Sequence, residues 1–263
     1  MPSCQRLAKG GLLLKPSIDG LKLGKSSGRS QKSVQVQELW RFPVKSMAGE
    51  RLAEVRVGRL GITGDRTVLV RGGNGRVITS RTHPKLLGLR ATISADGVPR
   101  ISGHIWNSPE ALGLVHAAVG PGSELFYCGG PERFDVLPLL VATDGAIAAF
   151  GHDGRRLRPN LVIGGVEGLA ERTWPGHCLR IGDVRIGVQD LRARCVMTTF
   201  DPDTLVQEHG VLKEIVRKFD GVLALNCFVI RGGTIHLGDT VELVDMPKDC
   251  VTRAGSESVR VWS

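Results

Sequence analysis

Short stretches of alternating apolar and polar residues follow one another from about residue 34 onward. Between residues 52 and 57, Val55 and Val57 fall on one face and Glu54 and Arg56 on the other. A period of two predicts half-buried strands. Further stretches that predict strands cover residues 34–40, 68–71, 76–79, 89–94 and 98–101.

Glycine-rich turns separate these stretches. Asn74-Gly75 lies between two of them and predicts a hairpin with a primed turn, because both types of residue tolerate a positive φ. Closely spaced strands joined by such turns are typical of a β-barrel or a β-sandwich. The later part of the chain repeats the pattern at residues 136–141, with a break at Pro138, and at 161–163, 179–181, 184–188, 227–230 and 234–244.

Three segments predict short helices instead. Ser108 is a plausible N-cap and Pro109 suits the first helical position. Thr143 is a second candidate N-cap, for a helix that closes at Gly151. Residues 212–219 carry apolar side chains at helical spacing. We therefore expect a mainly β (α+β) chain with a few short helices.

Composition and charge narrow the class of protein. The chain has 263 residues, 41% hydrophobic and 23% charged, as in soluble globular proteins. Of the formal net charge of +9, residues 1–33 contribute +6, from seven Lys and Arg against one Asp, so the other 230 residues carry only +3. We predict a flexible basic leader, with a transit-like segment or a misplaced start codon as alternatives. A nucleic-acid-binding module is disfavoured, because the body is near-neutral and poor in aromatic residues.

The length of the apolar runs and the spacing of the cysteines predict the compartment and the membrane association. No apolar run approaches the roughly 18 residues that span a bilayer, and none forms a signal-peptide core. The six cysteines include no C-x-x-C pair, which disfavours zinc-ribbon and thioredoxin folds, and no ferredoxin spacing is present. We expect a cytoplasmic protein with no membrane partner, with organellar targeting by the leader left open.

One run of residues carries the strongest chemical signal: Arg-Cys-Val-Met-Thr-Thr-Phe-Asp-Pro-Asp-Thr at residues 194–204. Cys195 follows Arg194, whose permanent charge favours a thiolate. Pro202 restrains Asp201 away from helix, so we expect a strand that ends in a rigid loop with Cys195 beside the turn. Such a cysteine suits a soft-metal ligand or a nucleophile.

Three more runs accompany it: Arg-Pro-Asn-Leu-Val-Ile-Gly-Gly at 158–165, Phe-Pro-Val-Lys-Ser-Met at 42–47 and Gly-Asp-Arg at 64–66. Together the four runs resemble the MOSC family, which is named for the C-terminal domain of molybdenum-cofactor sulfurase. The resemblance is strongest to the branch of the mitochondrial amidoxime-reducing component and its bacterial relatives. It extends from about residue 34 to about residue 245.

The resemblance implies an N-terminal β-barrel-like domain packed on a β-rich MOSC domain. The boundaries that we expect are a leader at 1–33, the N-terminal domain at 34–125, the MOSC domain at 126–245 and a C-terminal tail at 246–263.

The resemblance also implies a pyranopterin molybdenum cofactor. Cys195 matches the family's cysteine and is the expected metal ligand and catalytic residue, although an isolated cysteine is often a buried structural residue. Cations and short donors suit the phosphate of the cofactor, although any one of them alone would be a surface residue. The residues that match the family's cofactor contacts are Lys45, Ser46, Arg66, Arg158, Asn160 and Arg194.

Other polar residues of these runs have two interpretations. Asn160 could bond the pterin edge or serve a turn at the strand entrance. For Asp201 and Asp203, side-chain bonds within an Asx turn are favoured over contacts with a metal-bound water. Asp135 matches a family aspartate, and a turn role is equally plausible.

The implied activity is the reduction of N-hydroxylated or N-oxide-type compounds at molybdenum, with electrons from a separate electron-transfer protein. The alternative is a sulfur carrier for cofactor sulfuration or transfer, with a persulfide on Cys195. The family also carries a fold-level association with pyridoxal phosphate.

Overall fold

The computed structural model describes residues 33–247. The expected leader, apart from Ser33, and the expected C-terminal tail beyond residue 247 lie outside the described residues.

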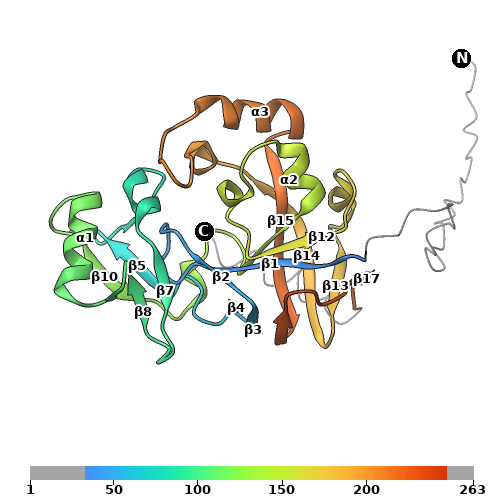
Figure 1. Cartoon of the computed structure of the whole chain (residues 1–263), viewed down its shortest axis with the longest axis horizontal. Coiled ribbons are helices and arrows are strands. Elements are labelled where there is room, and N and C mark those ends of the chain that lie inside the picture. The colour runs from blue at the N-terminus through green and yellow to red at the C-terminus, as the bar shows by residue number, and fades with distance from the viewer. Residues whose placement is uncertain (1–32, 248–263) are drawn as a thin grey trace, which may run out of the picture. The chain divides into compact units, whose positions relative to one another are not determined.

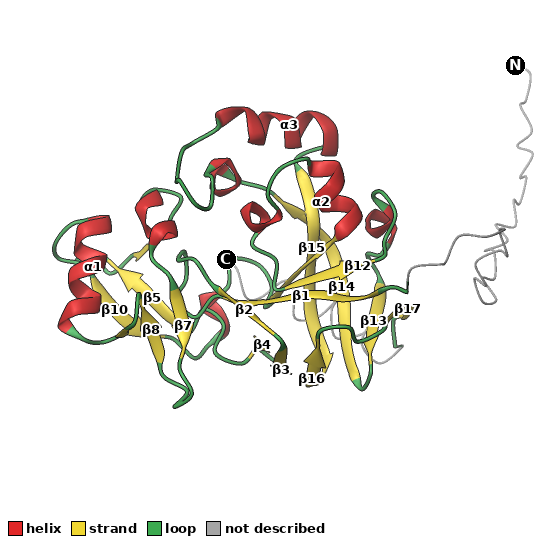
Figure 2. Ribbon diagram, in the orientation of Figure 1, coloured by secondary structure: helices red, strands yellow, loops and turns green. Residues whose placement is uncertain are grey.

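One large sheet organises the described residues (Figure 2). Its eight strands follow the order β17-β13-β14-β15-β11-β12-β1-β2, with antiparallel neighbours except for the parallel pair of β11 and β12. Apolar side chains at alternating positions form the main core on this sheet, including Leu39, Leu161 and Leu225, each fully buried. The strands are β1 Gln35–Arg41, β2 Glu50–Leu52, β11 Leu139–Thr143, β12 Leu161–Gly164, β13 His177–Ile181, β14 Val184–Ala193, β15 Val222–Arg231 and β17 Val241–Asp245.

Three smaller sheets have three strands each. The first has the order β10 (Glu124–Tyr127), β5 (Val68–Arg71), β6 (Val77–Ile78). The second has the order β16 (Gly233–His236), β3 (Glu54–Gly58), β4 (Gly61–Ile62), and the third β7 (Ala91–Ile93), β8 (Pro99–Ile101), β9 (His104–Ile105).

Three α-helices cover the sheets. Helix α1 (Pro109–Val119) lies against the small sheets, whereas α2 (Asp144–Phe150) and α3 (His209–Phe219) share a separate core cluster (Figure 1). The expected N-caps are confirmed, since the Ser108 hydroxyl accepts from Ala111 N and the Thr143 hydroxyl accepts from Ala146 N. The 3-10 helices are η1 Pro84–Gly88, η2 Pro131–Arg133, η3 Gly154–Leu157, η4 Ala170–Thr173 and η5 Val196–Thr199.

The structure corrects three local predictions. The primed turn at Asn74-Gly75 is wrong, because Gly75 has a positive φ of 77° and Asn74 does not. The strand predicted over 136–141 with a break at Pro138 is present only beyond that break, from Leu139, so residues 136–137 are not strand; Pro138 has no N–H to donate. The strand predicted over 234–244 is divided into β16 and β17 by a turn at Gly238, whose φ is 85°.

The mainly β class with a few short helices is confirmed. Strands β1 and β2 belong to the same sheet as the strands that follow residue 138, and β16 pairs with β3. Segments on both sides of the expected domain boundary at residue 125 therefore share ladder hydrogen bonds, and the exact boundary stays a prediction. None of the four sheets within residues 33–247 is shown to close into a barrel.

Candidate functional site

The loop that follows β1 is held against the turn that precedes β5. Arg66 N donates to Phe42 O at 2.7 Å, and Phe42 N donates to the buried Asp65 carboxylate at 2.7 Å. Lys45 N donates to Val68 O at 2.9 Å. These bonds bring the Lys-Ser pair at 45–46 next to Arg66, whose guanidinium also pairs with Asp65.

Arg158 ties a third segment to this loop. It ends η3, and its guanidinium donates to Met47 O at 2.7 Å. The same guanidinium lies 4.3 Å from the centroid of the Phe42 ring, and that of Arg66 lies 5.1 Å from it. Cations over an aromatic face are attracted by the ring quadrupole, so Phe42 holds both guanidiniums in place.

The cysteine run forms the fourth segment. Arg194, just beyond the end of β14, donates to Leu157 O at 2.8 Å. Cys195 is partly exposed and begins η5, with its carbonyl accepting from Thr198 N and Thr198 Oγ1 at 3.1 and 2.8 Å. A 3-10 turn therefore separates the cysteine from the turn at residues 201–204, which we had expected to lie beside it.

The expected Asx turn is confirmed. Asp201 Oδ1 accepts from the backbone N–H groups of Asp203 and Thr204 at 3.1 and 2.9 Å. The Asp203 carboxylate pairs instead with Arg155.

The four segments enclose a cavity of about 80 Å³. The sequence-predicted residues that line it are Lys45, Ser46, Arg66, Arg158, Arg194 and Cys195. Four further charged residues line it: Asp135, and three that no sequence motif singled out, Arg81, Arg156 and Arg192. Arg192 could have been found, because it lies only two residues before Arg194 in the sequence; no sequence signal distinguishes Arg81.

Asp135 is the one carboxylate among the described residues that line this cavity. It lies 2.8 Å from Lys45 Nζ, 2.8 Å from Arg81 and 3.7 Å from Arg192. Burial acts to raise the pKa of Asp135, but Lys45, Arg81 and Arg192 outweigh it and lower the pKa below its ordinary value. Asp135 is therefore ionised at neutral pH.

Positive charge exceeds negative charge in the cavity. Seven cationic side chains line it, and the carboxylates paired with them in the described residues are four: Asp65, Asp135, Asp201 and Glu208. Three positive charges are left uncompensated, and a buried charge without a partner is costly.

Arg158 and Arg194 account for most of this excess, since neither forms an ion pair within residues 33–247. Burial, with repulsion by Arg66, lowers the pKa of Arg158 to about 9; burial, with repulsion by Arg192, lowers the pKa of Arg194 to about 10. Both side chains remain cationic at neutral pH. The buried Nε atoms of Arg194 and Arg156 also have no hydrogen-bond partner among the residues that the structure describes. The cavity is therefore built for an anion.

Three lining residues have a left-handed backbone. The φ angles of Ser46, Arg66 and Arg158 are 71°, 54° and 56°. Residues other than glycine adopt this region at a cost, and such positions cluster at binding sites.

Asn160 is the one sequence-predicted site residue that the structure does not bring to the cavity. It is fully buried, and its Oδ1 accepts from Leu140 N at 3.1 Å and from Arg66 at 3.3 Å. Its Nδ2 donates to Trp40 O at 3.3 Å. The amide is thus used within the protein, where it connects β1, β11 and Arg66.

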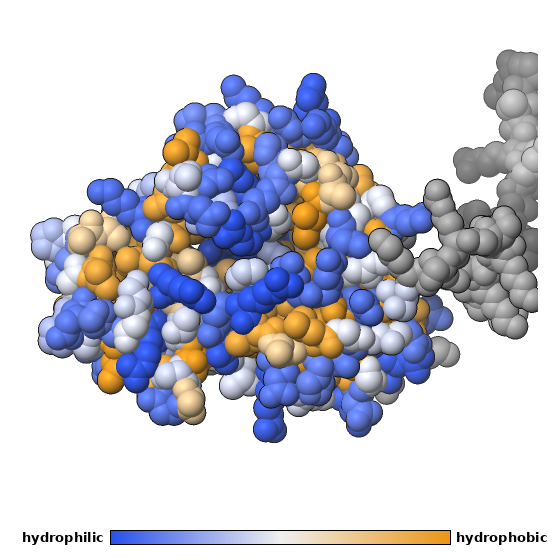
Figure 3. Space-filling model, in the orientation of Figure 1, coloured by the Kyte–Doolittle hydropathy of each residue, from blue (hydrophilic) through white to orange (hydrophobic). Residues whose placement is uncertain are grey.

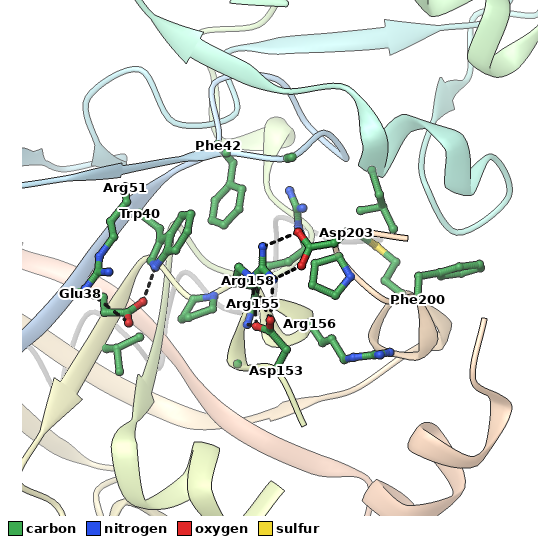
Figure 4. Close-up of a pocket in the computed structure, with 18 of the residues that line it drawn as sticks. Glu38, Trp40, Phe42, Arg51, Asp153, Arg155, Arg156, Arg158, Phe200 and Asp203 are labelled. Atoms are coloured by element: carbon green, nitrogen blue, oxygen red, sulfur yellow. Dashed lines mark hydrogen bonds and ion pairs between the residues drawn. The ribbon is translucent and has the colours of Figure 1, made fainter. Parts of the chain in front are cut away.

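A second, larger cavity of about 660 Å³ adjoins the first (Figure 4). Arg156, Arg158 and Met197 line both cavities. In the space-filling view, the surface is hollowed between β1, β2 and the segments below α3, with mostly hydrophilic residues around the hollow (Figure 3).

The comparisons with known proteins agree with this arrangement. Residues 33–108 match the MOSC N-terminal beta barrel domain, and residues 147–242 match the MOSC domain. The chain belongs to the MOSC family. The four segments that build the small cavity all fall within these two matched domains.

Among curated proteins, the chain is similar to human mitochondrial amidoxime-reducing component 1, with 25% identity over 80% of this chain and 82% of that protein. It is also similar to mitochondrial amidoxime reducing component 2 of Macaca fascicularis, with 24% identity over 67% of this chain and 69% of that protein. Among solved structures, the YuaD protein of Bacillus subtilis has 12% identity and a TM-score of 0.46, covering 82% of this chain and 97% of that chain.

The fold-level association with pyridoxal phosphate finds no support. Neither the matched domains nor the names of these relatives refer to pyridoxal phosphate, and we do not propose it for this MOSC protein. Within residues 33–247, no three His, Cys, Asp or Glu side chains are arranged to hold a metal ion. In the same residues, no helix is both long and apolar enough to cross a bilayer.

Proposed function

We propose that this protein is a molybdenum-cofactor-dependent oxidoreductase that reduces N-hydroxylated or N-oxide-type compounds, with Cys195 as the protein ligand to the metal. The observation that carries the proposal is the cavity in which a partly exposed thiol lies among cations with three uncompensated charges. The names of the relatives supply the reaction class, since an amidoxime is an N-hydroxylated amidine.

The residues fit the ends of such a cofactor. A cavity of about 80 Å³ accommodates a phosphate-sized anion, given that one water occupies about 30 Å³ in the liquid. Soft sulfur suits molybdenum, and a cavity rich in Arg and Lys suits a phosphate. The buried Nε atoms without partners are donors that such an anion would satisfy.

Each side chain then has a task. Lys45, Arg66 and Arg158 would hold the phosphate, with Ser46 as a short donor. Arg194 and Arg192, which line the same cavity, would add positive charge near the sulfur of Cys195. The cofactor, when bound, supplies the two-electron chemistry that breaks the substrate's N–O bond and releases the oxygen as water.

Protons for that water come from solvent in this proposal. Release of one water from an N-hydroxyl compound consumes two electrons and two protons. No histidine in the described chain lines either cavity, and Asp135 is held ionised by the cations around it. A solvent-fed reaction has no requirement for a protein acid of neutral pKa.

Electrons would come from a separate electron-transfer protein. The sequence contains no iron–sulfur or flavin motif, so a small redox partner that docks near the cavity is part of the proposal. We propose that the protein is cytoplasmic. The names of the relatives refer to mitochondria instead, so imaging of the tagged full chain is the test that separates the two compartments.

The deciding experiment measures molybdenum per chain by elemental mass spectrometry, in protein purified from a host that makes the cofactor. We expect near-stoichiometric metal in the wild type and a large loss in Cys195→Ala. Cys128→Ala is the matched control, because Cys128 is buried beside Glu132 and lines neither cavity.

The outcomes separate the two candidate functions. Metal in wild type and in Cys128→Ala, with little in Cys195→Ala, supports the reductase, which is then assayed with an N-hydroxylated substrate and a chemical reductant. Neither metal nor pterin in a folded wild type contradicts it. A persulfide on Cys195 in that case would favour the sulfur carrier.

A further inference from the structure

The larger cavity shares Arg156, Arg158 and Met197 with the Cys195 cavity, and its other lining residues have no task in the proposed binding of the cofactor's anion. Its volume of about 660 Å³ lies within the usual range for a small-molecule site. It is lined by apolar and aromatic residues together with charged ones, whereas cations dominate the Cys195 cavity.

Trp40 and Phe42 form a flat aromatic wall in this cavity (Figure 4). Their ring centroids are 6.5 Å apart and their planes differ by 15°. Phe42 is buried, and the Arg158 guanidinium lies over its ring, whereas Trp40 is partly exposed. The wall thus offers one aromatic face, that of Trp40, for a ligand.

The indole of Trp40 is fixed in orientation. Its Nε1 donates to Glu38 Oε2 at 2.7 Å, and Glu38 lies 3.5 Å from Arg51. The main chain of Trp40 is fixed as well, by Asn160, which directly precedes β12. An oriented aromatic face needs little reordering when a planar ligand stacks on it.

The segment that follows Cys195 forms another wall. Met197, Phe200 and Pro202 line the cavity, and Met197 also lines the Cys195 cavity. Arg155 holds this segment in place by pairing with Asp203 at 2.5 Å and with Asp153 at 2.7 Å (Figure 4).

We propose that the larger cavity binds the planar aromatic or heteroaromatic body of the substrate against Trp40, with the N–O group directed past Met197 toward Cys195. This inference rests on the proposed function, which it deepens by naming a substrate class: N-oxygenated compounds with an aromatic ring. Met197, unbranched and polarisable, suits the position between the ring and the reacting group.

The test compares two probes with the same reacting group, benzamidoxime and cyclohexanecarboxamidoxime. Dissociation constants are measured by isothermal titration calorimetry with protein from a cofactor-producing host. The variants are Trp40→Leu, which removes the aromatic face, Trp40→Phe, which keeps one, and the control Tyr127→Leu, at an aromatic residue that is 61% exposed and lines neither cavity.

We expect the phenyl probe to bind more tightly than the cyclohexyl probe. Trp40→Leu should weaken the phenyl probe about tenfold, as expected for loss of an aromatic pair. Trp40→Phe should stay within about threefold of wild type, and Tyr127→Leu should have no effect. Equal binding of the two probes, or a change below about twofold in a folded Trp40→Leu, would overturn the inference.

A readout in wild-type protein covers the case in which Trp40→Leu does not fold. In ¹⁵N-labelled protein, the indole N–H signal of Trp40, assigned from Trp40→Phe, should shift as the phenyl probe is added. A shift confined to other indole signals, or no shift, counts against the assignment.

The Cys195→Ala protein separates this inference from the proposed function. It should retain Trp40-dependent binding of the phenyl probe, because Cys195 does not line the larger cavity. If the phenyl probe binds to Cys195→Ala but not to cofactor-loaded wild type, the cofactor itself occupies the larger cavity, and the inference is overturned. If wild type contains no molybdenum yet binds the phenyl probe in a Trp40-dependent way, the missing metal refutes the reductase, whereas the binding supports the aromatic site.

Discussion

Replacement of Asn160 by alanine separates a structural role for this residue from a cofactor contact. The amide is fully buried and bonds Leu140 N, Trp40 O and the Arg66 guanidinium. Asn160→Ala would leave the Leu140 N–H and the Trp40 carbonyl without these partners inside the protein. It would also free one donor of Arg66.

The expected loss can be worked out from these groups. A buried polar group left without its partner costs about 1–3 kcal/mol. Two groups lose their partner, since Arg66 keeps its pair with Asp65. The bond to Leu140 is 3.1 Å long and that to Trp40 is 3.3 Å, so a value near the middle of that range applies to the first and one near its low end to the second. We expect the free energy of unfolding to fall by about 3 kcal/mol, which lowers Tm by about 6–12 °C for a chain of this size.

The assay is urea unfolding of cofactor-free protein, followed by circular dichroism. Asn107→Ala is the control, because Asn107 is exposed, and it should change stability by less than about 0.5 kcal/mol. If Asn160→Ala is as stable as wild type without cofactor, yet binds less cofactor, the buried-network argument is refuted. Asn160 would then be the pterin contact that the sequence predicts.

Three further outcomes are expected. Burial raises the pKa of Glu171. Its contribution to stability is therefore complete below its unfolded pKa of about 4.5 and is lost as pH rises through the higher folded value. In urea unfolding at several pH values, Glu171→Gln should lose less stability than wild type above about pH 4.5. Asp135→Asn removes the carboxylate that contacts three cations, so cofactor-free protein should bind inorganic phosphate severalfold more tightly. The affinity is measured by the shift in Tm, and added salt should diminish the effect. An unchanged affinity would place phosphate elsewhere. Gly64→Ala should destabilise by more than about 1 kcal/mol in thermal unfolding, since Gly64 has a φ of 81° and a Cβ would lie 2.2 Å from Ile93 Cδ1; a neutral effect would mean that this turn relaxes.

Local signals predicted the elements of the fold well. The caps at Ser108 and Thr143 act within one turn of helix, so the sequence around them was sufficient. The Asn74-Gly75 turn was wrong, because the main chain of Asn74 does not follow the positive φ that its residue type permits. How β1 joins β12, more than a hundred residues away, is not encoded in any local pattern.

The residues of the candidate site also include some that the sequence predicts and some that it does not. Lys45, Arg66 and Arg158 each lie in a run that resembles the family, and all three line the Cys195 cavity. Arg81 lies in no such run and reaches the cavity only through the folded chain. The burial of Asn160 was invisible as well, because a polar residue at a strand entrance looks the same whether it faces solvent or the interior.

At Ser46, Arg66 and Arg158, a left-handed backbone lowers the stability of the protein, while the side chains there are ones that would bind an anion. At such positions a residue with a Cβ costs about 1–2 kcal/mol that glycine avoids. For Arg158, glycine would also remove a cation that has no carboxylate partner in the described residues. A directed-evolution experiment that selects only for heat resistance should therefore enrich glycine at Ser46 and Arg158, and each gain would remove a donor from the anion cavity. At Arg66 the change is opposed, because glycine would leave the buried Asp65 carboxylate without its cation.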